Sequence, residues 1–463
     1  MGAFGRRSAL GLARTCSIAL CVATLSLVVC APATAAGHTW ARSWNPRPGY
    51  FIAQALLAAA PGGGVYVGTT PCSATSPMHW ESGIAVAHYT PAGRRLWGKL
   101  LAKATHSGVA AVASDPAGNL IVAGFGPVRG GGAEWRLIKL SPAGKQLWHA
   151  RLRGVAKSTA PTAPQAVVVD AAGNVYVCGQ LAHGNTGTDA ALAKFSRRGK
   201  LLWKRFLDGS AHGDDLATGL ARDPAGHIYV AGHLEEVGHG YDVFVARYAA
   251  HGHRTWLRLW DNRSTSGDDC AWAVAASSAG VAVAGSTQGA WNSDFGQYDN
   301  DGLVLKYAPN GGFVYEWIVP GTAWWGEFSA VAIDAVGNVA AAGAISTGST
   351  GRYKAVLLKL SPAPAQLYCS WLPASSDRGG FSALATRRGT LLAVGYEGSD
   401  TGSWSNMLFH TVTPRLVTTT HTYSSGAGTV NDATAVLCRG AATYVAGTAG
   451  TGVLQEKMAL IRF

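Results

Sequence analysis

Short apolar segments that end in glycine recur along the chain. Clear examples are Val65-Tyr66-Val67-Gly68, Ile121-Val122-Ala123-Gly124, Val175-Tyr176-Val177-Cys178-Gly179 and Ile228-Tyr229-Val230-Ala231-Gly232. Their length and their valine, isoleucine and tyrosine content are typical of β-strands. No segment of comparable length shows the 3.6-residue period of an amphipathic helix, so the pattern predicts an almost entirely β protein.

The same segment returns at a regular interval. Its closing glycines are Gly68, Gly124, Gly179, Gly232, Gly285, Gly343, Gly395 and Gly447. Successive glycines are 52 to 58 residues apart, which gives eight copies. Self-similarity at such a period predicts a repeat architecture in which each copy is one supersecondary unit.

Each copy predicts four short strands, called A to D here in chain order. In the second copy, strand A leads into the turn Asp115–Asn119, strand B is the glycine-ended segment, strand C contains Leu137–Leu140 and strand D contains Lys145–Trp148. The turn returns in the third, fourth and sixth copies. Aspartate accepts hydrogen bonds within such a turn and glycine adopts a positive φ, so an A–B hairpin is expected.

The two ends of the chain predict that the repeats close into a ring. The last copy stops after its strand C, at Lys457–Phe463. The missing strand D resembles Trp40–Trp44, which is similar to Trp256–Trp260 of the fourth copy. We therefore expect an all-β β-propeller of eight four-stranded blades, in which an N-terminal strand completes the last blade. Seven blades are the fallback if one copy is degenerate.

The repeats resemble the bacterial β-propeller repeats known as the SBBP family. The similarity is strongest at Gly213–Asp215, Asp223–Gly232 and Asp242–Tyr248, and it covers nearly all of residues 38–463. The seventh and eighth copies lack the Asp-x-x-Gly-Asn turn. The resemblance implies a propeller and an exported binding scaffold, but it implies no single activity, because a fold does not fix a function.

Residues 1–36 predict a secretory signal peptide. Arg6, Arg7 and Arg14 form a basic start, residues 16–31 are apolar, and Ala33-Thr34-Ala35 is a small-residue cleavage site. We expect residues 37–463 to form a single propeller domain that is secreted or associated with the cell surface. The apolar run is too short for a transmembrane span, and none is expected later.

Composition narrows the class of partner. The chain has 463 residues, 60 glycines, 14% charged residues and a net charge of +12, which excludes a disordered chain. Loss of residues 1–36 would remove three arginines and leave 35 basic against 26 acidic residues, a net charge of +9. These charges are dispersed, so a nucleic-acid partner is not expected. They favour loose association with an anionic cell surface or polymer.

The cysteines predict neither a zinc site nor a disulfide framework. Five lie beyond residue 36, far apart and without a CxxC pair: Cys72, Cys178, Cys270, Cys369 and Cys438. Their odd number leaves at least one thiol unpaired within the chain.

Several residue types recur at fixed places in the repeat. Tryptophans recur on strand D at Trp97, Trp148, Trp203, Trp256, Trp317 and Trp371. Basic residues recur on strand C at His88, Lys139, Lys194, Arg247, Lys306, Lys359, His410 and Arg462. Periodic tryptophans favour packing between blades over a sugar-stacking platform. The basic residues are expected to bury their stems and pair with nearby aspartates rather than bind anions.

Aspartates and histidines offer weaker candidates for a metal site. Aspartates recur just before strand C at Asp189, Asp242 and Asp301, and just before strand A at Asp214, Asp215, Asp268, Asp269 and Asp432. Histidines gather in the fourth copy at His227, His233, His239, His251 and His253. Regular placement favours loop capping over calcium ligation, and no metal site is expected.

The B–C connection of the fifth copy, residues 286–301, is the longest and least repetitive. We predict a ligand-binding site there, formed by Trp291, Asn292, Asp294, Tyr298 and Asp299. Aromatic, carboxylate and amide groups on a rigid scaffold suit a sugar or a peptide. An insertion that folds over its own blade is the structural alternative, and both remain open.

No catalytic residue and no cofactor is predicted, because the chain lacks GxSxG, HExxH, P-loop and dinucleotide motifs. The expected function is a monomeric, non-catalytic binding or scaffolding module for an extracellular carbohydrate, peptide or cell-envelope partner. The alternative is a propeller enzyme, either a lyase or a quinoprotein-like oxidoreductase. Ser141–Trp148 resembles the tryptophan-docking repeat of eight-bladed quinoprotein dehydrogenases, but that family's adjacent cysteine pair is absent beyond residue 36.

Overall fold

The computed structural model describes most of the chain from residue 39 to the C-terminus. The signal sequence expected at residues 1–36 lies outside the described part. The other gaps are 47–49, 77–78, 129–131, 155–161, 184–186, 263–266, 293–296, 322–324, 348–351, 373–377, 399–404, 416–417, 425–429, 440 and 451–456.

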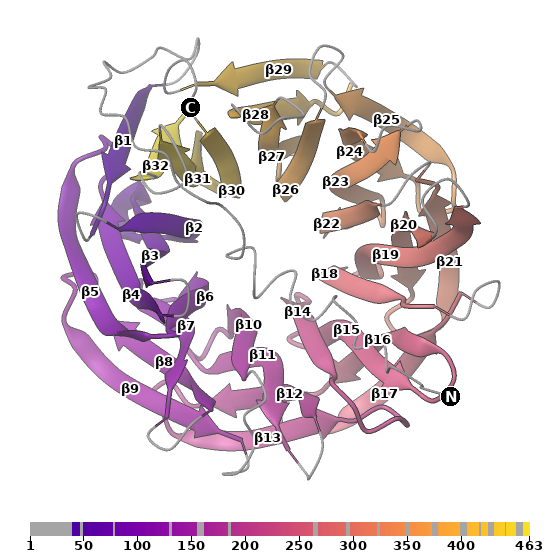
Figure 1. The fold of residues 1–463 in the computed structure, drawn as a ribbon, viewed down its shortest axis with the longest axis horizontal. Helices are drawn as coiled ribbons and strands as arrows, with labels where there is room; N and C mark the ends of the chain where they lie inside the picture. Colours follow the sequence, from indigo (N-terminus) through magenta and orange to yellow (C-terminus); the bar gives the residue numbers. More distant parts are fainter. Residues whose placement is uncertain are drawn as a thin grey trace.

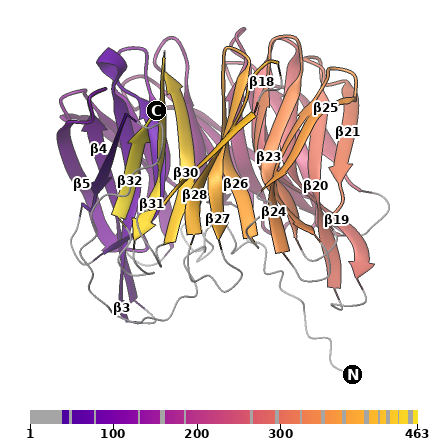
Figure 2. The ribbon, with the colours of Figure 1, turned by 90° about the horizontal axis from the view of Figure 1, so that it is seen from above.

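Eight antiparallel sheets of four strands are arranged in a ring, and strand A is the innermost strand of each sheet (Figure 1). The predicted eight-bladed propeller is therefore confirmed, and the seven-bladed fallback is wrong. The four strands of each blade are those predicted as A to D. Seen from the side, the molecule is a short cylinder in which the strands run roughly parallel to the axis (Figure 2).

The first four blades have the following strands. Blade 1 is β2 (Phe51–Ala59), β3 (Val65–Ser76), β4 (His79–Tyr89) and β5 (Arg95–Thr105); blade 2 is β6 (Gly108–Ser114), β7 (Leu120–Pro127), β8 (Ala133–Leu140) and β9 (Gln146–Arg153); blade 3 is β10 (Ala163–Val169), β11 (Val175–Ala182), β12 (Thr188–Phe195) and β13 (Leu201–Leu207); blade 4 is β14 (Leu216–Arg222), β15 (Ile228–Glu236), β16 (Gly240–Tyr248) and β17 (Arg254–Trp260).

The other four blades follow the same order. Blade 5 is β18 (Cys270–Ser277), β19 (Gly280–Asn292), β20 (Gln297–Tyr307) and β21 (Phe313–Val319); blade 6 is β22 (Gly326–Ile333), β23 (Val339–Thr347), β24 (Arg352–Leu360) and β25 (Gln366–Leu372); blade 7 is β26 (Arg378–Arg387), β27 (Thr390–Gly398), β28 (Ser405–Val412) and β29 (Thr418–Tyr423); blade 8 is β30 (Val430–Arg439), β31 (Ala442–Gly450), β32 (Lys457–Arg462) and β1 (Trp40–Trp44). A short 3-10 helix, η2 (Pro61–Gly63), joins β2 to β3. Within the described part of the chain, no helix is long and apolar enough to cross a membrane.

The glycine that marks each repeat has a structural cause. Strand A carries a β-bulge, which in blade 4 shifts the register between Ala217 and Gly219. The bulge brings the backbone of β14 so close to Gly232 of β15 that a Cβ there would lie 1.9 Å from the Leu216 carbonyl oxygen. Only glycine fits this approach, which recurs in blades 2 to 8. In blade 1 the Cβ position of Gly68 is instead 2.7 Å from the Val112 side chain of the next blade.

The turns between strands A and B are closed as their sequence predicts. The backbone N–H of Asn119 donates to Asp115 Oδ1 over 2.8 Å, and Gly118 has a φ of 78°. In blade 4, His227 replaces the asparagine and its Nδ1 lies 2.8 Å from Asp223 Oδ2. This histidine therefore caps a turn.

The N-terminal strand closes the ring as predicted. β1 pairs with β32 in a register that runs from Trp40 opposite Arg462 to Trp44 opposite Met458. Both tryptophans are buried in one apolar cluster with Met458 and Leu460. The first strand and the last three therefore form one blade.

Tryptophans on strand D join neighbouring blades. Trp97 donates its indole N–H to the Pro142 carbonyl oxygen over 2.8 Å and lies against Gly144 in the C–D turn of the next blade. The same indole-to-turn bond is made by Trp40, Trp148, Trp203 and Trp256. The packing interpretation is therefore confirmed for these strands.

In blades 5 and 6 a tyrosine takes this docking position, although Trp317 also packs against the apolar cluster between these two blades, as predicted. Tyr315 stands opposite Lys306 and Tyr368 opposite Lys359, where blades 1 to 4 and blade 8 place a tryptophan opposite the basic residue of strand C. Trp317 and Trp371 lie two and three residues further along. The sequence pattern favours tryptophan for this position because tryptophan recurs there in other copies. The observed strand pairing instead places a tyrosine opposite the basic residue.

The basic residues of strand C reach the same turns. Lys139 Nζ lies 2.7 Å from Asp115 Oδ2 and donates to the Arg197 carbonyl oxygen of the next blade over 3.2 Å. Lys306 donates to the carbonyl oxygens of Gly337 and Pro362 over 2.8 and 3.1 Å. Buried stems are confirmed, but blade-to-blade carbonyl contacts are as important as the aspartates.

All five cysteines beyond residue 36 are free thiols. Cys72, Cys178 and Cys270 are buried, and burial raises the pKa of the Cys72 and Cys178 thiols to about 12. These thiols act as small apolar core residues.

Candidate functional site

The B–C and D–A connections lie on one rim of the cylinder, from which β3 and β19 extend furthest (Figure 2). The predicted loop 286–301 is mostly strand, because β19 and β20 continue to Asn292 and from Gln297. Their register pairs Trp291 with Tyr298 across this hairpin. The backbone of this segment therefore forms a hairpin that extends its own blade, and whether it binds a ligand stays a prediction.

The predicted residues of this hairpin differ in exposure. Tyr298 is exposed, whereas Asp299 is buried. Asp294 and the side chains of Trp291 and Asn292 lie outside the described residues. Two cavities lie elsewhere in the ring.

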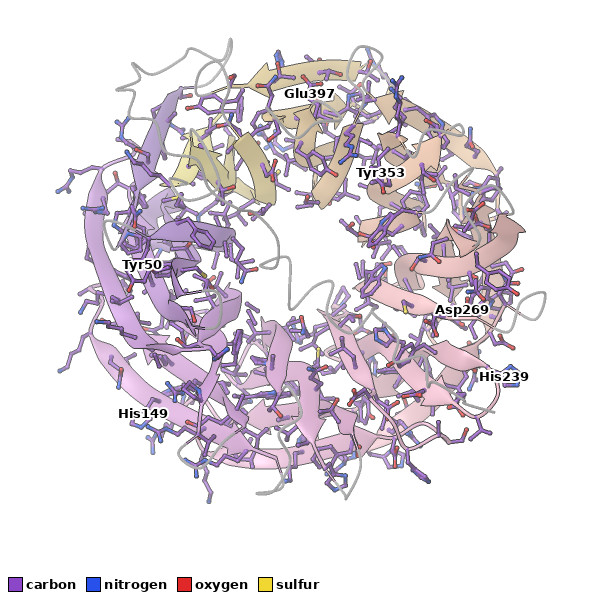
Figure 3. All side chains as sticks on the ribbon, viewed as in Figure 1. Tyr50, His149, His239, Asp269, Tyr353 and Glu397 are labelled. Atoms are coloured by element: carbon purple, nitrogen blue, oxygen red, sulfur yellow. The ribbon has the colours of Figure 1, made fainter. Side chains whose placement is uncertain are left out.

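An aromatic cavity of about 310 Å³ lies between blades 6 and 7 on the same rim. Its aromatic walls are Trp325, Tyr353, Phe381 and Tyr396, and its polar groups include Glu327, Ser329 and Ser382. Figure 3 labels Tyr353 on blade 6, on the side that faces blade 7. Apolar walls with a few converging polar groups are typical of small-ligand sites.

The strand pleat explains why these side chains meet. Glu327 pairs with Ala344, and Ser346, two residues on, pairs with Tyr353, so all four occupy one face of blade 6. That face meets blade 7 at Gly380, where a Cβ would lie 3.2 Å from the Ala344 side chain. A glycine at this point keeps the two blades close without filling the space above them.

The electrostatics of the aromatic cavity favour a neutral, hydroxyl-rich ligand. Ser329 donates to Glu327 Oε1 over 3.0 Å, and the Arg378 guanidinium lies 5.9 Å from the centre of the Tyr353 ring. Burial, helped by nearby acidic groups that include Glu327, raises the pKa of Tyr396 to about 12, so its hydroxyl stays a donor at neutral pH. The cavity thus offers both hydrogen-bond donors and acceptors.

A second cavity, of about 500 Å³, lies between blades 7 and 8 on the opposite rim. It occurs where neither blade supplies its part of the contact between a strand D tryptophan and the C–D turn of the next blade. Thr420 stands opposite His410 in place of a tryptophan, and blade 8 has no C–D turn because its strands C and D are the two ends of the described chain. Arg387, Arg388, His410 and His421 line it with Phe409 and Phe463.

The aspartates near strands A and C gather in two triads on the B–C and D–A rim. The first triad is Asp189, Asp208 and Asp215, and the second is Asp242, Asp261 and Asp269. Within each triad, one carboxylate oxygen of every residue lies within 4.8 Å of the other two. Asp215 also accepts hydrogen bonds from the backbone N–H groups of Gly209 and Glu235. The loop-capping prediction is therefore confirmed for Asp215, but the convergence of three carboxyl groups was missed.

The first triad gives an expected pH dependence. Burial raises the pKa of Asp215 to about 7, far above the value near 3.9 of an unfolded chain. A raised carboxyl pKa adds stability that is complete below about pH 4 and is lost as the pH rises through about 7. We expect the Tm in EDTA to fall between pH 5 and pH 8, and to fall less steeply in Asp215→Asn. Parallel curves for the two proteins would contradict this assignment.

No protein-family model matches the chain, and no curated protein matches it. Similar solved structures include the periplasmic gluconolactonase PpgL of Pseudomonas aeruginosa, with a TM-score of 0.44, 13% identity, and coverage of 81% of this chain and 96% of that chain. The propeller domain of the Trilobed protease from Pyrococcus furiosus gives a TM-score of 0.41 at 8% identity, over 78% of this chain and 94% of that chain. A protein of unknown function from Dyadobacter fermentans gives 0.40 at 8% identity, over 92% and 98%. At these scores and identities the similarities carry no inference about function.

Proposed function

We propose that the chain is an exported, non-catalytic binding module built from SBBP-type repeats, and that it takes a saccharide in the cavity between blades 6 and 7. The observation that carries this proposal is the convergence of Trp325, Tyr353, Phe381 and Tyr396 around Glu327. Export and membership of the repeat family rest on the sequence: the basic and apolar start of the chain and the quoted repeat motifs.

The chemistry of the walls supports a saccharide. Aromatic rings offer flat apolar surfaces to the C–H faces of a sugar ring, and a carboxylate and hydroxyls hydrogen-bond to its hydroxyl groups. Glu327 accepts such bonds, whereas the Tyr396 hydroxyl donates. A cavity of about 310 Å³ is at the lower end of the usual range for small-ligand sites, which fits one or two sugar units.

Glycan-array screening followed by calorimetry tests the proposed function. We expect Tyr353→Ala to weaken binding of an array hit about tenfold or more, because an aromatic anchor in a pocket contributes at least about 1.4 kcal/mol. Phe313→Ala is the matched control, since Phe313 is an exposed aromatic residue of β21, outside the cavity. All variants should keep the wild-type Tm within a few degrees.

Two further outcomes are decisive. Tyr298→Ala tests the hairpin that the sequence suggested; if it weakens binding and Tyr353→Ala does not, the cavity is the wrong site. Conversion of the bound glycan by wild-type protein, detected by mass spectrometry, would favour the enzyme alternative. A quinone absorbance spectrum in the purified protein would favour the oxidoreductase.

A further inference from the structure

The two aspartate triads occupy equivalent places in successive blades. Asp189 and Asp242 lie near the start of strand C, Asp208 and Asp261 follow strand D, and Asp215 and Asp269 precede strand A of the next blade. Each triad therefore links one blade to the next on the B–C and D–A rim. The equivalence allows one triad to serve as the reference for the other.

Two histidines contact carboxyl groups of the first triad. His183 Nδ1 lies 2.7 Å from Asp189 Oδ2, and His212 Nδ1 lies 2.8 Å from Asp208 Oδ2. Asp215, the third member, has both oxygens bonded to backbone N–H groups. Among the described residues, this triad leaves no buried carboxylate oxygen without a partner.

In the second triad, formed by Asp242, Asp261 and Asp269, such contacts leave two carboxylate oxygens without a partner. Asp242 is 92% buried, and its Oδ1 has no hydrogen-bond partner among the described residues; the same holds for Asp261 Oδ1. The Asp242 carboxyl group nevertheless points into the cluster, since one of its oxygens lies within 4.8 Å of carboxylate oxygens of Asp261 and Asp269.

The charged groups around Asp242 are mostly acidic. Glu236 and Asp261 add negative charge. Among the described residues, the basic side chain that acts on Asp242 is His239, whose Nδ1 lies 3.6 Å from Asp261 Oδ2 and whose side chain is more than half exposed. Figure 3 labels Asp269 and His239 at this junction of blades 4 and 5. Burying like charges together without a counterion is costly, so this cluster favours the binding of a cation.

We propose that Asp242, Asp261 and Asp269 bind a Ca²⁺ ion that ties blade 4 to blade 5. The ligand atoms that lie within 4.8 Å of one another among the described residues are all carboxylate oxygens, which suit a hard cation better than zinc, since zinc prefers sulfur and imidazole ligands. Calcium accepts six to eight oxygen ligands in flexible geometry, which backbone carbonyls and water complete. Thr287 donates to Asp269 Oδ1 over 2.6 Å and so orients that ligand.

The ion would act at a junction that already depends on hydrogen bonds. The Asn262 backbone N–H donates to Asp269 Oδ2 over 2.7 Å, and the Asn262 side chain donates to Thr287 Oγ1 over 3.0 Å. Thr287 belongs to β19, whose hairpin extends beyond the rim. Calcium is therefore expected to rigidify this hairpin as well as the junction of the two blades.

Thermal unfolding with and without calcium tests the proposal. After removal of metals with EDTA, we expect saturating Ca²⁺ to raise the Tm of the wild-type protein by about 2 °C or more. Asp242→Asn should lose this rise, whereas Asp189→Asn, its counterpart in the first triad, should keep it. Absence of a rise in the wild-type protein, or a full rise in Asp242→Asn, would overturn the proposal.

Terbium luminescence provides a second measurement that does not depend on stability. Tb³⁺ replaces Ca²⁺ at oxygen sites, and Trp272 lies three residues from Asp269 in the sequence. We expect sensitised terbium emission from the wild-type protein, and we expect Ca²⁺ to abolish it by displacing Tb³⁺. Asp261→Asn should bind terbium at least about tenfold more weakly. The Asp261 side chain is partly exposed and lies outside the strands. Equal terbium affinity in Asp261→Asn and the wild-type protein would contradict the assignment even if Asp242→Asn failed to fold.

Discussion

A chain that begins at residue 47, without β1, is expected to lose cooperative folding or to melt far below the full domain. The deletion bares the edge of β32 and removes two buried tryptophans. Trp40 also donates to the Pro91 carbonyl oxygen of blade 1 over 2.9 Å, and Trp44 packs within 3.0 Å of the Cβ position of Gly98. Loss of a buried tryptophan costs about 3–5 kcal/mol, so two are comparable with the 5–15 kcal/mol of a typical domain.

Circular dichroism melts and size-exclusion chromatography measure this effect. A chain that begins at residue 37 is the control and should behave like the full-length protein, because it keeps all of β1. A synthetic peptide of residues 38–46, added in excess, should partly restore the Tm of the shortened chain, because it can pair with β32 in the place of β1. A chain starting at residue 47 that melts within a few degrees of the control would show that ring closure does not depend on this strand.

The fold could be predicted because its determinants are local and repeated. A bulge in strand A forces a glycine in strand B, as at Gly232, and an aspartate with a following glycine closes the A–B turn, as at Asp115. Each feature depends on residues close in sequence; the glycine recurs in all eight copies and the aspartate–glycine turn in four of them. The closing strand was predictable because Trp40–Trp44 repeats a strand D sequence that the last copy lacks.

The candidate sites could not be predicted, because they depend on departures from the repeat and on contacts between blades. Tyr353 and Tyr396 belong to different blades, so the sequence of a single repeat does not show that they meet. The sequence did mark Asp242 and Asp269 as recurrent aspartates. It gave no means to know that Asp261, at the end of another strand, completes a cluster with them.

Replacing a docking tryptophan should cost more than replacing an exposed one. Trp256 is 91% buried, donates to the Pro309 carbonyl oxygen over 3.2 Å and covers Gly311, where a Cβ would lie 2.8 Å from the indole. We expect Trp256→Ala to lower the free energy of unfolding by about 3–5 kcal/mol, measured by urea denaturation, because it removes a large buried ring and leaves a cavity between two blades.

Trp371→Ala is the matched control, because Trp371 lies on the outer strand β25 with 42% of its surface exposed. Its replacement should cost about 1 kcal/mol or less. Trp256→Tyr should fall between the two alanine variants, since blades 5 and 6 place Tyr315 and Tyr368 at the equivalent position. Equal losses for Trp256→Ala and Trp371→Ala would mean that the turn contact contributes little. The blades would then be held together mainly by the flat apolar faces of their inner strands.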